Sequence, residues 1–306
     1  MPIDLLAGAH APFFRAVPKP MPAITKPDLA KPANVLVFDS GLGGLTVFVE
    51  VARAWPEARF TYVADDAGFP YGRLGEAALV ARVLEVMAAL VARHAPDVVL
   101  VACNTASTLV MGPLRARFQD VAFVGTVPAI KPAAAASQSK MFSVLATPGT
   151  VARDYTRELV REYAGHCAVK LVGAVKLAGL AERFMQGEAI ADADIAAEIA
   201  PCFVTDGARR TDCVVLACTH FPLLIERFKA LAPWPVVWID PAPAIARRAA
   251  QVLGETLGFT RGAAAAAQAG EAYFTSGALP GQALKMALRL RGLEALQSEP
   301  IPLALA

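Results

Sequence analysis

Short apolar runs rich in β-branched residues alternate along the chain with longer segments whose apolar positions recur at helical spacing. The short runs predict buried strands at residues 34–38, 60–64, 98–102, 122–125, 142–146, 169–172, 214–217, 236–239 and 272–275. The longer segments predict helices at residues 75–94, 151–163, 190–207, 223–232 and 242–257. Continuous apolar strands that alternate with helices are typical of parallel sheets covered on both faces. The pattern therefore predicts an α/β fold with mostly parallel sheets.

Two of the predicted strands end in the same way. Residues 97–107 read DVVLVACNTAS and residues 212–222 read DCVVLACTHFP. In each segment an apolar run ends in Ala-Cys and is followed at once by small hydroxyl or amide residues. Strands near residues 35 and 142 also lead into similar glycine-containing turns. The repetition predicts two pseudo-symmetric α/β domains, each of which offers one thiol to a shared cleft.

The repeat also suggests how the chain is divided. We expect an irregular N-terminal extension at residues 1–33, a first domain at 34–127 and 236–290, and a second domain at 128–235. The extension is rich in proline and has no basic segment ahead of a continuous apolar stretch, so a secretory signal is not expected. No run of about 18 apolar residues is free of polar interruption, and a membrane span is not expected either.

Composition narrows the class of protein further. The 306 residues are enough for about two domains, and 56% of them are hydrophobic. The formal net charge of +2 is too balanced to indicate a nucleic-acid surface. Five cysteines make an odd count, which favours free thiols in a reducing cytosol over a disulfide framework. The cysteines and histidines form no CxxC or HExxH pattern, so no metal site is predicted.

Residues that follow parallel strands are the best candidates for a ligand site, because ligands bind beyond the carboxyl ends of such strands. The turn at residues 40–47, SGLGGLTV, is either an ordinary tight turn or an anion-binding turn. Residues 64–72, ADDAGFPYG, are either a surface turn or a loop in which Tyr71 and the Gly72 amide hold a carboxylate. Asn104 and Thr105 could bind the charged groups of an amino acid.

The two repeated cysteines carry the candidate chemistry. A thiol at a helix N-terminus can have its pKa lowered below about 8.5. Two opposed thiols can remove a proton from one face of a carbon and return one to the other face. His220 stands two residues after Cys218 and could be its proton acceptor or its positive neighbour. The remaining cysteines, which lack such surroundings, are interpreted as structural: Cys167, Cys202 and Cys213.

Six segments together resemble glutamate racemase, in the aspartate/glutamate racemase superfamily. They occur in the family order and span nearly the whole chain beyond residue 33. The segments are FDSGLGGLTV (38–47), ADDAGFPYG (64–72), VACNTAST (101–108), LATPGTV (145–151), LACTHFPLL (216–224) and IDPA (239–242). The resemblance implies a two-domain α/β fold with the active site between the halves. It also implies interconversion of L- and D-glutamate, which supplies D-glutamate for peptidoglycan synthesis.

The resemblance further implies roles for individual residues. Cys103 would take the proton from D-glutamate and Cys218 from L-glutamate, assisted by Asp39 and His220 respectively. The implied substrate-binding residues are Asp39, Ser40, Tyr71, Gly72, Asn104, Thr105, Thr147, Thr150, Thr219 and His220. Glu182 falls where the family often has an acidic residue near the site. Residues 173–182 nevertheless read GAVKLAGLAE, without the Cys-Pro pair that commonly precedes that residue.

No cofactor is expected. No lysine stands in a recognisable setting for a pyridoxal phosphate Schiff base, and the two-thiol scheme needs none. The lysines considered are Lys131, Lys140, Lys170 and Lys176. Glutamate is the expected small-molecule partner, a homodimer is an expectation from the resemblance, and the expected location is the cytoplasm.

Three alternatives remain open from the sequence. The protein could racemise aspartate or a related amino acid. It could instead be a thiol hydrolase or transferase with Cys218 as nucleophile and His220 as base, which would leave the repeat at Cys103 unexplained. It could also be a non-catalytic binding or regulatory protein, although both thiols and their polar neighbours are retained.

Overall fold

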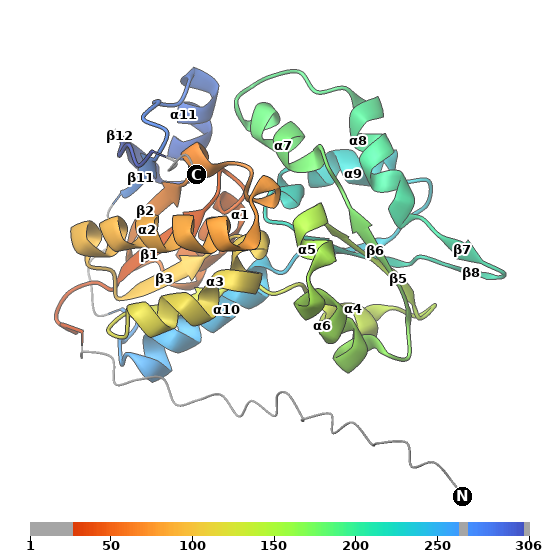
Figure 1. The fold of residues 1–306 in the computed structure, drawn as a ribbon, viewed down its shortest axis with the longest axis horizontal. Helices are drawn as coiled ribbons and strands as arrows, with labels where there is room; N and C mark the ends of the chain where they lie inside the picture. Colours follow the sequence, from red (N-terminus) through yellow and green to blue (C-terminus); the bar gives the residue numbers. More distant parts are fainter. Residues whose placement is uncertain (1–26, 263–268, 303–306) are drawn as a thin grey trace, which may run out of the picture.

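The computed structural model describes residues 27–262 and 269–302. Most of the expected N-terminal extension, residues 1–26, lies outside this range. Residues 27–33 contain no helix or strand and lead directly into the first strand. Figure 1 shows two lobes, one holding the red, orange and blue elements and the other the green elements. Each lobe is built on one parallel sheet, and the expected α/β fold with mostly parallel sheets is confirmed.

The first sheet has six strands in the order β12-β11-β2-β1-β3-β4, and every pairing between neighbours is parallel. Its central strands are apolar throughout because helices cover both of their faces. The strands are β1 (Asn34–Asp39), β2 (Arg59–Ala64), β3 (Val98–Val101), β4 (Ala122–Gly125), β11 (Gly270–Phe274) and β12 (Leu293–Ser298).

Alternate residues of β1 supply the two cores of the first lobe. Val35 and Val37 pack with α1, α10 and α11, whereas Leu36 and Phe38 pack with α2 and α3. This alternation follows from the two-residue period of a strand. The helices are α1 (Leu45–Ala54), α2 (Glu76–His94), α3 (Asn104–Arg117), α10 (Ala242–Gln251) with a π-helical turn at Val252–Thr256, and α11 (Gln282–Arg289).

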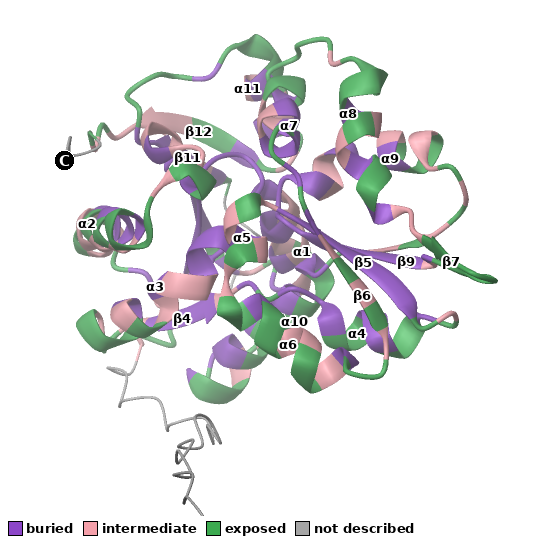
Figure 2. Cartoon of the chain, turned by 45° about the vertical axis from the view of Figure 1, so that its right-hand side comes forward, coloured by how far each residue is buried: buried purple, intermediate pink, exposed green. Residues whose placement is uncertain are grey.

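The second sheet has four parallel strands in the order β10-β9-β5-β6. They are β5 (Met141–Ala146), β6 (Ala168–Gly173), β9 (Cys213–Ala217) and β10 (Val237–Ile239). Figure 2 shows β5 and β9 as buried between their helices. On one face of this sheet, a hydrophobic core is formed with α4 (Ile130–Ala136) and α6 (Asp154–Ala164). The other core packs α7 (Leu177–Met185), α8 (Asp192–Ile199) and α9 (Ile225–Leu231) on the opposite face.

Shorter elements complete the described chain. An antiparallel pair, β7 (Thr205–Asp206) and β8 (Arg209–Arg210), projects from the second lobe. The five-residue helix α5 (Pro148–Ala152) follows β5 directly. The 3₁₀ turns are Asp66–Gly68, Tyr71–Arg73, Ala200–Cys202 and Phe221–Leu224. Among the described residues, no helix combines the length and apolar character needed to cross a membrane.

The structure corrects several predicted boundaries. Val237–Ile239 pairs in register with Cys213–Val215, so β10 belongs to the second sheet. The expected boundary at residue 235 would have placed this strand in the first domain. The helix predicted at 151–163 is two helices, α5 and α6, because Arg153 adopts an extended conformation between them. The helix predicted at 190–207 ends at Ile199. Strand β12 was not predicted.

Candidate active site

The carboxyl ends of four strands bring most of the predicted site residues together. In the first sheet, Asp39 ends β1, and Cys103 follows the neighbouring β3 at the start of α3. In the second sheet, Thr147 follows β5, and Cys218 follows the neighbouring β9. The two thiols thus occupy matching places in the two sheets.

The glycine turn after β1 packs against the turn after β9. The Leu42 N–H donates to Glu182 Oε1 (2.6 Å), and the Gly43 N–H points at His220 Nε2 (3.2 Å). The Thr46 hydroxyl donates to the Thr219 carbonyl (3.2 Å). A Cβ at Gly43 would overlap the imidazole ring of His220. A backbone N–H group of this turn therefore binds a carboxylate, in line with the anion-binding interpretation of residues 40–47. That carboxylate belongs to Glu182 of the same chain.

Cys103 is a protonated thiol at neutral pH. Its side chain is buried, and the Ser40 hydroxyl lies 3.8 Å from its sulfur. Burial raises the pKa of the Cys103 thiol well above its usual value, and the negative charge of Asp39 raises it further. The lowering expected from a helix N-terminus is therefore wrong for Cys103, because desolvation outweighs the helix dipole.

Cys218 has a different neighbour. Its sulfur lies 3.8 Å from His220 Nδ1, and His220 Nε2 lies 2.7 Å from Glu182 Oε1. Burial by itself lowers the pKa of His220, but hydrogen bonds to Cys218 and Glu182, together with the charges of Asp39 and Glu182, raise it well above 6.5.

Three threonine hydroxyls join the two domains beside Cys103. Thr105 Oγ1 lies 3.0 Å from Thr147 Oγ1 and 3.3 Å from Thr150 Oγ1. The hydroxyls of Thr147 and Thr150 are 3.0 Å apart, and the Thr150 N–H donates to Thr147 Oγ1 (3.2 Å). Each hydroxyl can rotate to donate to a ligand or accept from one.

Two buried side chains of the site carry polar atoms without a hydrogen-bond partner. Asn104 is 2% exposed, and neither its Oδ1 nor its Nδ2 has a partner among the described residues. Asp39 Oδ2 accepts a hydrogen bond from the Gly44 N–H (2.9 Å). Asp39 Oδ1, like the two Asn104 atoms, has no partner among the described residues. Burial raises the pKa of the Asp39 carboxyl. Buried polar atoms are normally paired, so these groups are suited to bind a ligand.

Tyr71 differs from the role expected for it. The residue is buried, and its hydroxyl donates to Asp65, which leaves it committed inside the protein. Gly72 lies at the junction of the domains, where a Cβ would be 3.8 Å from Thr147. The partners Asp65 and Arg82 were not predicted, although Arg82 stands conspicuously within the buried face of α2.

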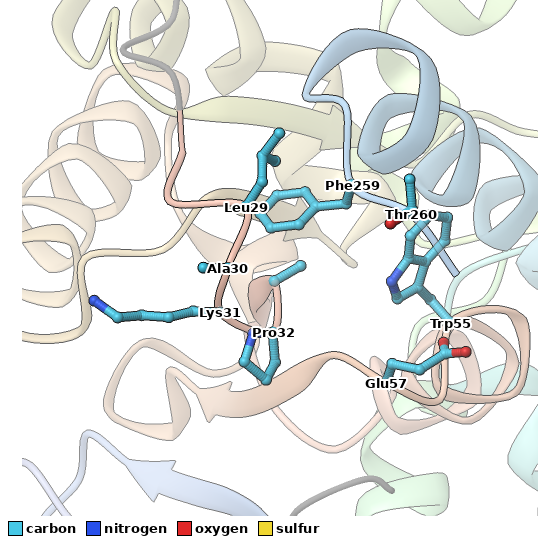
Figure 3. A pocket seen from close by; sticks show the side chains of 9 residues that line it. Leu29, Ala30, Lys31, Pro32, Trp55, Glu57, Phe259 and Thr260 are labelled. Carbon is cyan, nitrogen blue, oxygen red and sulfur yellow. The ribbon is translucent and has the colours of Figure 1, made fainter. Parts of the chain in front are cut away.

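The small pocket in Figure 3 lies elsewhere and contains none of the predicted site residues. It is lined by Leu29, Ala30, Lys31, Pro32, Ala33, Trp55, Glu57, Phe259 and Thr260. The described residues also include no group of three or more His, Cys, Asp or Glu side chains arranged to hold a metal ion.

The fold and the paired site define the class of two-domain α/β racemases. The chain belongs to the Asp/Glu/Hydantoin racemase family, whose model matches residues 40–249. It is 54% identical over 228 residues to a glutamate racemase of Brucella ovis, covering 74% of this chain and 82% of that protein. It is 56% identical over 222 residues to a glutamate racemase of Agrobacterium fabrum, covering 72% and 81% respectively.

A solved structure agrees with these relatives. Escherichia coli glutamate racemase, in complex with L-glutamate and the activator UDP-MurNAc-ala, superposes with a TM-score of 0.79 at 37% identity. The match covers 88% of this chain and 98% of that chain. The resemblance to glutamate racemase and the expected isomerase class are confirmed.

Proposed function

We propose that the protein interconverts L- and D-glutamate by proton transfer at Cα between Cys103 and Cys218, without pyridoxal phosphate. One observation carries the proposal. Two buried thiols follow equivalent strands of two sheets, and each has a polar group 3.8 Å away, Ser40 for Cys103 and His220 for Cys218. A single carbon held between them could be reached from both faces.

The unequal surroundings of the thiols suggest which of them begins as the acid. We propose that burial keeps the proton on Cys103, and that Cys218, beside the imidazolium of His220, acts as the base toward L-glutamate. Cys218 then removes the Cα proton of L-glutamate, and Cys103 delivers its proton to the opposite face to give D-glutamate. The sulfurs have exchanged protonation states, which the reverse reaction or solvent exchange restores. A positioned base of this kind contributes about 10²–10⁴ in rate.

The remaining polar groups are suited to hold the substrate. The unpaired amide of Asn104 can both donate and accept, and the unpaired oxygen of Asp39 can accept from an ammonium group. We propose that these groups bind glutamate with the side chains of Ser40 and Thr219, the Gly72 amide and the hydroxyls at Thr105, Thr147 and Thr150. Hydrogen bonds that strengthen as charge develops on the carboxylate would supply the rest of the acceleration.

The direct experiment follows the circular dichroism of L-glutamate in D₂O with purified protein and no added pyridoxal phosphate. We expect the signal of L-glutamate to decay as deuterium enters at Cα. Starting from D-glutamate, the solution should reach the same equilibrium mixture of the two enantiomers. L-aspartate is the matched control. Decay with aspartate alone would mean that the protein racemises aspartate by the same mechanism. No exchange with either amino acid would refute the proposal.

Mass spectrometry separates the racemase from the Cys-His hydrolase. A hydrolase would form a covalent acyl adduct on Cys218 with a thioester or amide substrate, whereas the two-base scheme forms no covalent intermediate. The matching position of Cys103 favours the racemase, because a hydrolase gives the second thiol no role.

We further propose that the product serves peptidoglycan synthesis in the cytoplasm, and that two copies form a homodimer. All five cysteines are free, which agrees with a reducing compartment. Expression of the gene should restore growth without added D-glutamate in a bacterium that lacks its own glutamate racemase. Continued dependence on D-glutamate would refute this role. Sedimentation of the purified protein tests the dimer.

A further inference from the structure

Asp65 lies at the carboxyl end of β2 and is fully buried, as is most of Arg82 in α2. Arg82 Nε donates to Asp65 Oδ2 (3.0 Å), and its Nη2 donates to Oδ1 of the same carboxylate. Both carboxylate oxygens accept a second bond, from the Tyr71 hydroxyl at Oδ2 and from Thr275 Oγ1 (2.6 Å) at Oδ1. A bidentate arginine fork and two hydroxyls therefore fix this carboxylate in one orientation.

The Asp65–Tyr71 bond shapes the loop that carries Gly72. Burial raises the pKa of Tyr71 well above 10, and the charge of Asp65 raises it further, so the hydroxyl keeps its proton and donates. Gly68 permits the close approach, since a Cβ there would lie 2.8 Å from the Tyr71 ring and 2.9 Å from Asp65 Oδ2. The backbone after Tyr71 then reaches the second domain, where a Cβ at Gly149 would be 3.6 Å from the Gly72 Cα.

The same arginine also holds the segment that follows β12. Its Nη1 donates to the Pro302 carbonyl (2.8 Å) and its Nη2 to the Ile301 carbonyl (2.6 Å). The Ile301 N–H in turn donates to the Thr275 carbonyl (3.0 Å). A closed ring of hydrogen bonds thus runs from Arg82 through residues 301 and 275 to Asp65 and back.

We infer that Arg82 is a positioning residue for the substrate loop. It holds Asp65, which holds the Tyr71 hydroxyl and so sets the Gly72 amide where the proposed function needs it to meet a glutamate carboxylate. The segment 299–302 belongs to the same scaffold, although it lies far from the two thiols in sequence. The inference rests on the proposed function only for the identity of the group that Gly72 meets.

The test compares Arg82→Lys and Tyr71→Phe with the control Arg93→Lys in the full chain. Lysine keeps the charge but cannot form the fork, and phenylalanine removes only the hydroxyl. Arg93 is also on α2 and pairs with Glu299 of the C-terminal segment (3.4 Å). Among the described residues it forms no ion pair or hydrogen bond with Asp65 or Tyr71. We expect KM for glutamate to rise about tenfold in both test variants, with a smaller change in kcat, and to stay unchanged in the control.

Two further measurements separate positioning from general stability. The double variant should raise KM no further than either single variant, because both break the same chain of contacts. Amide hydrogen exchange should become faster in residues 66–74 of Arg82→Lys and Tyr71→Phe, but not in Arg93→Lys. If Arg82→Lys fails to fold, Tyr71→Phe and the isosteric Thr275→Val decide by the same two readouts.

The outcomes are distinguishable from those of the proposed function. A wild-type protein inert toward glutamate would refute the proposed function, and exchange in residues 66–74 would still decide the positioning. Unchanged KM with unchanged exchange in the folded variants, or KM effects that multiply in the double variant, would overturn the role of Arg82.

Discussion

Cys103 and Cys218 are buried to a similar degree, but one faces the carboxyl of Asp39 and the other a protonated imidazole. We predict that Cys103→Ser and Cys218→Ser each lower racemisation by about 10²–10⁴, because a serine hydroxyl has a much higher pKa than a thiol and so neither ionises to act as the base nor readily gives up its proton. Polarimetry with both glutamate enantiomers measures the effect. Cys167→Ser, at a half-buried position away from the site, should retain wild-type activity. Full activity in either test variant would rule out the two-base scheme.

Glu182 acts on the reaction through His220. We predict that Glu182→Gln lowers the pKa of His220, because the variant removes a negative charge that now raises it. The imidazolium is then lost at a lower pH, so the alkaline limb of the kcat/KM profile for L-glutamate should move to lower pH. A loss of about tenfold at pH 8 is the expected size.

Glu188→Gln is the matched control for that experiment. Glu188 pairs with Arg183 at the surface, near the same helix as Glu182. Its substitution should leave the profile where it is in the wild type. An unshifted profile in Glu182→Gln would show that the carboxylate does not govern the charge of His220.

At the scale of elements, the turn between β1 and α1 depends on its glycines for contact with the second domain. We predict that Gly43→Ala pushes the His220 ring aside, because the new Cβ would occupy the position of the ring. Overpacking of this kind costs about 1–3 kcal/mol of stability, and racemisation should fall with it. Gly75→Ala, where a Cβ meets nothing within 4 Å, should leave the activity unchanged. Wild-type behaviour in both variants would contradict the described packing.

Strands buried on both faces could be predicted from sequence, and so could three of the four edge strands of the parallel sheets, but the edge strand β12 could not. Strands β1, β3, β5 and β9 are continuous apolar runs because helices cover both sides of them. Strand β12 lies at an edge and is mostly exposed or half-buried, so its sequence, LEALQS, has no strand-like pattern. The sheet to which β10 belongs is decided by its pairing with β9, which no local pattern encodes.

The site was predictable where its chemistry is local. Cys103 and Cys218 stand at strand ends that the apolar pattern identifies. The raised pKa of Cys103 was not predictable, because it arises from burial within the folded protein and from the nearby charge of Asp39. Nor was the bond from Arg82 to residues 301 and 302, which are about 220 positions away in the chain. Contacts of that range depend on the whole fold.

For the whole molecule, the buried His220 makes stability depend on pH. Its pKa in the folded state is well above 6.5, the ordinary value that the unfolded chain has. Below about pH 6.5 both states hold the proton, and the stabilisation is fully present. As pH rises toward the folded-state pKa, the unfolded chain loses its proton while the folded protein keeps it. The free energy of unfolding should therefore fall by up to about 1.4 kcal/mol per pH unit in this window.

Denaturant unfolding at pH 6.5, 7.5 and 8.5 measures this slope in the wild type and in His220→Asn. The variant should be less stable at pH 6.5 but should lose much of the slope, since it has no imidazole to titrate. His94→Asn is the control, because burial lowers the pKa of His94 and leaves that ring neutral in both states above pH 6.5. Its slope should match the wild type. Equal slopes in the wild type and in His220→Asn would mean that His220 is not held as an imidazolium, and the base proposed at Cys218 would lose its positive neighbour.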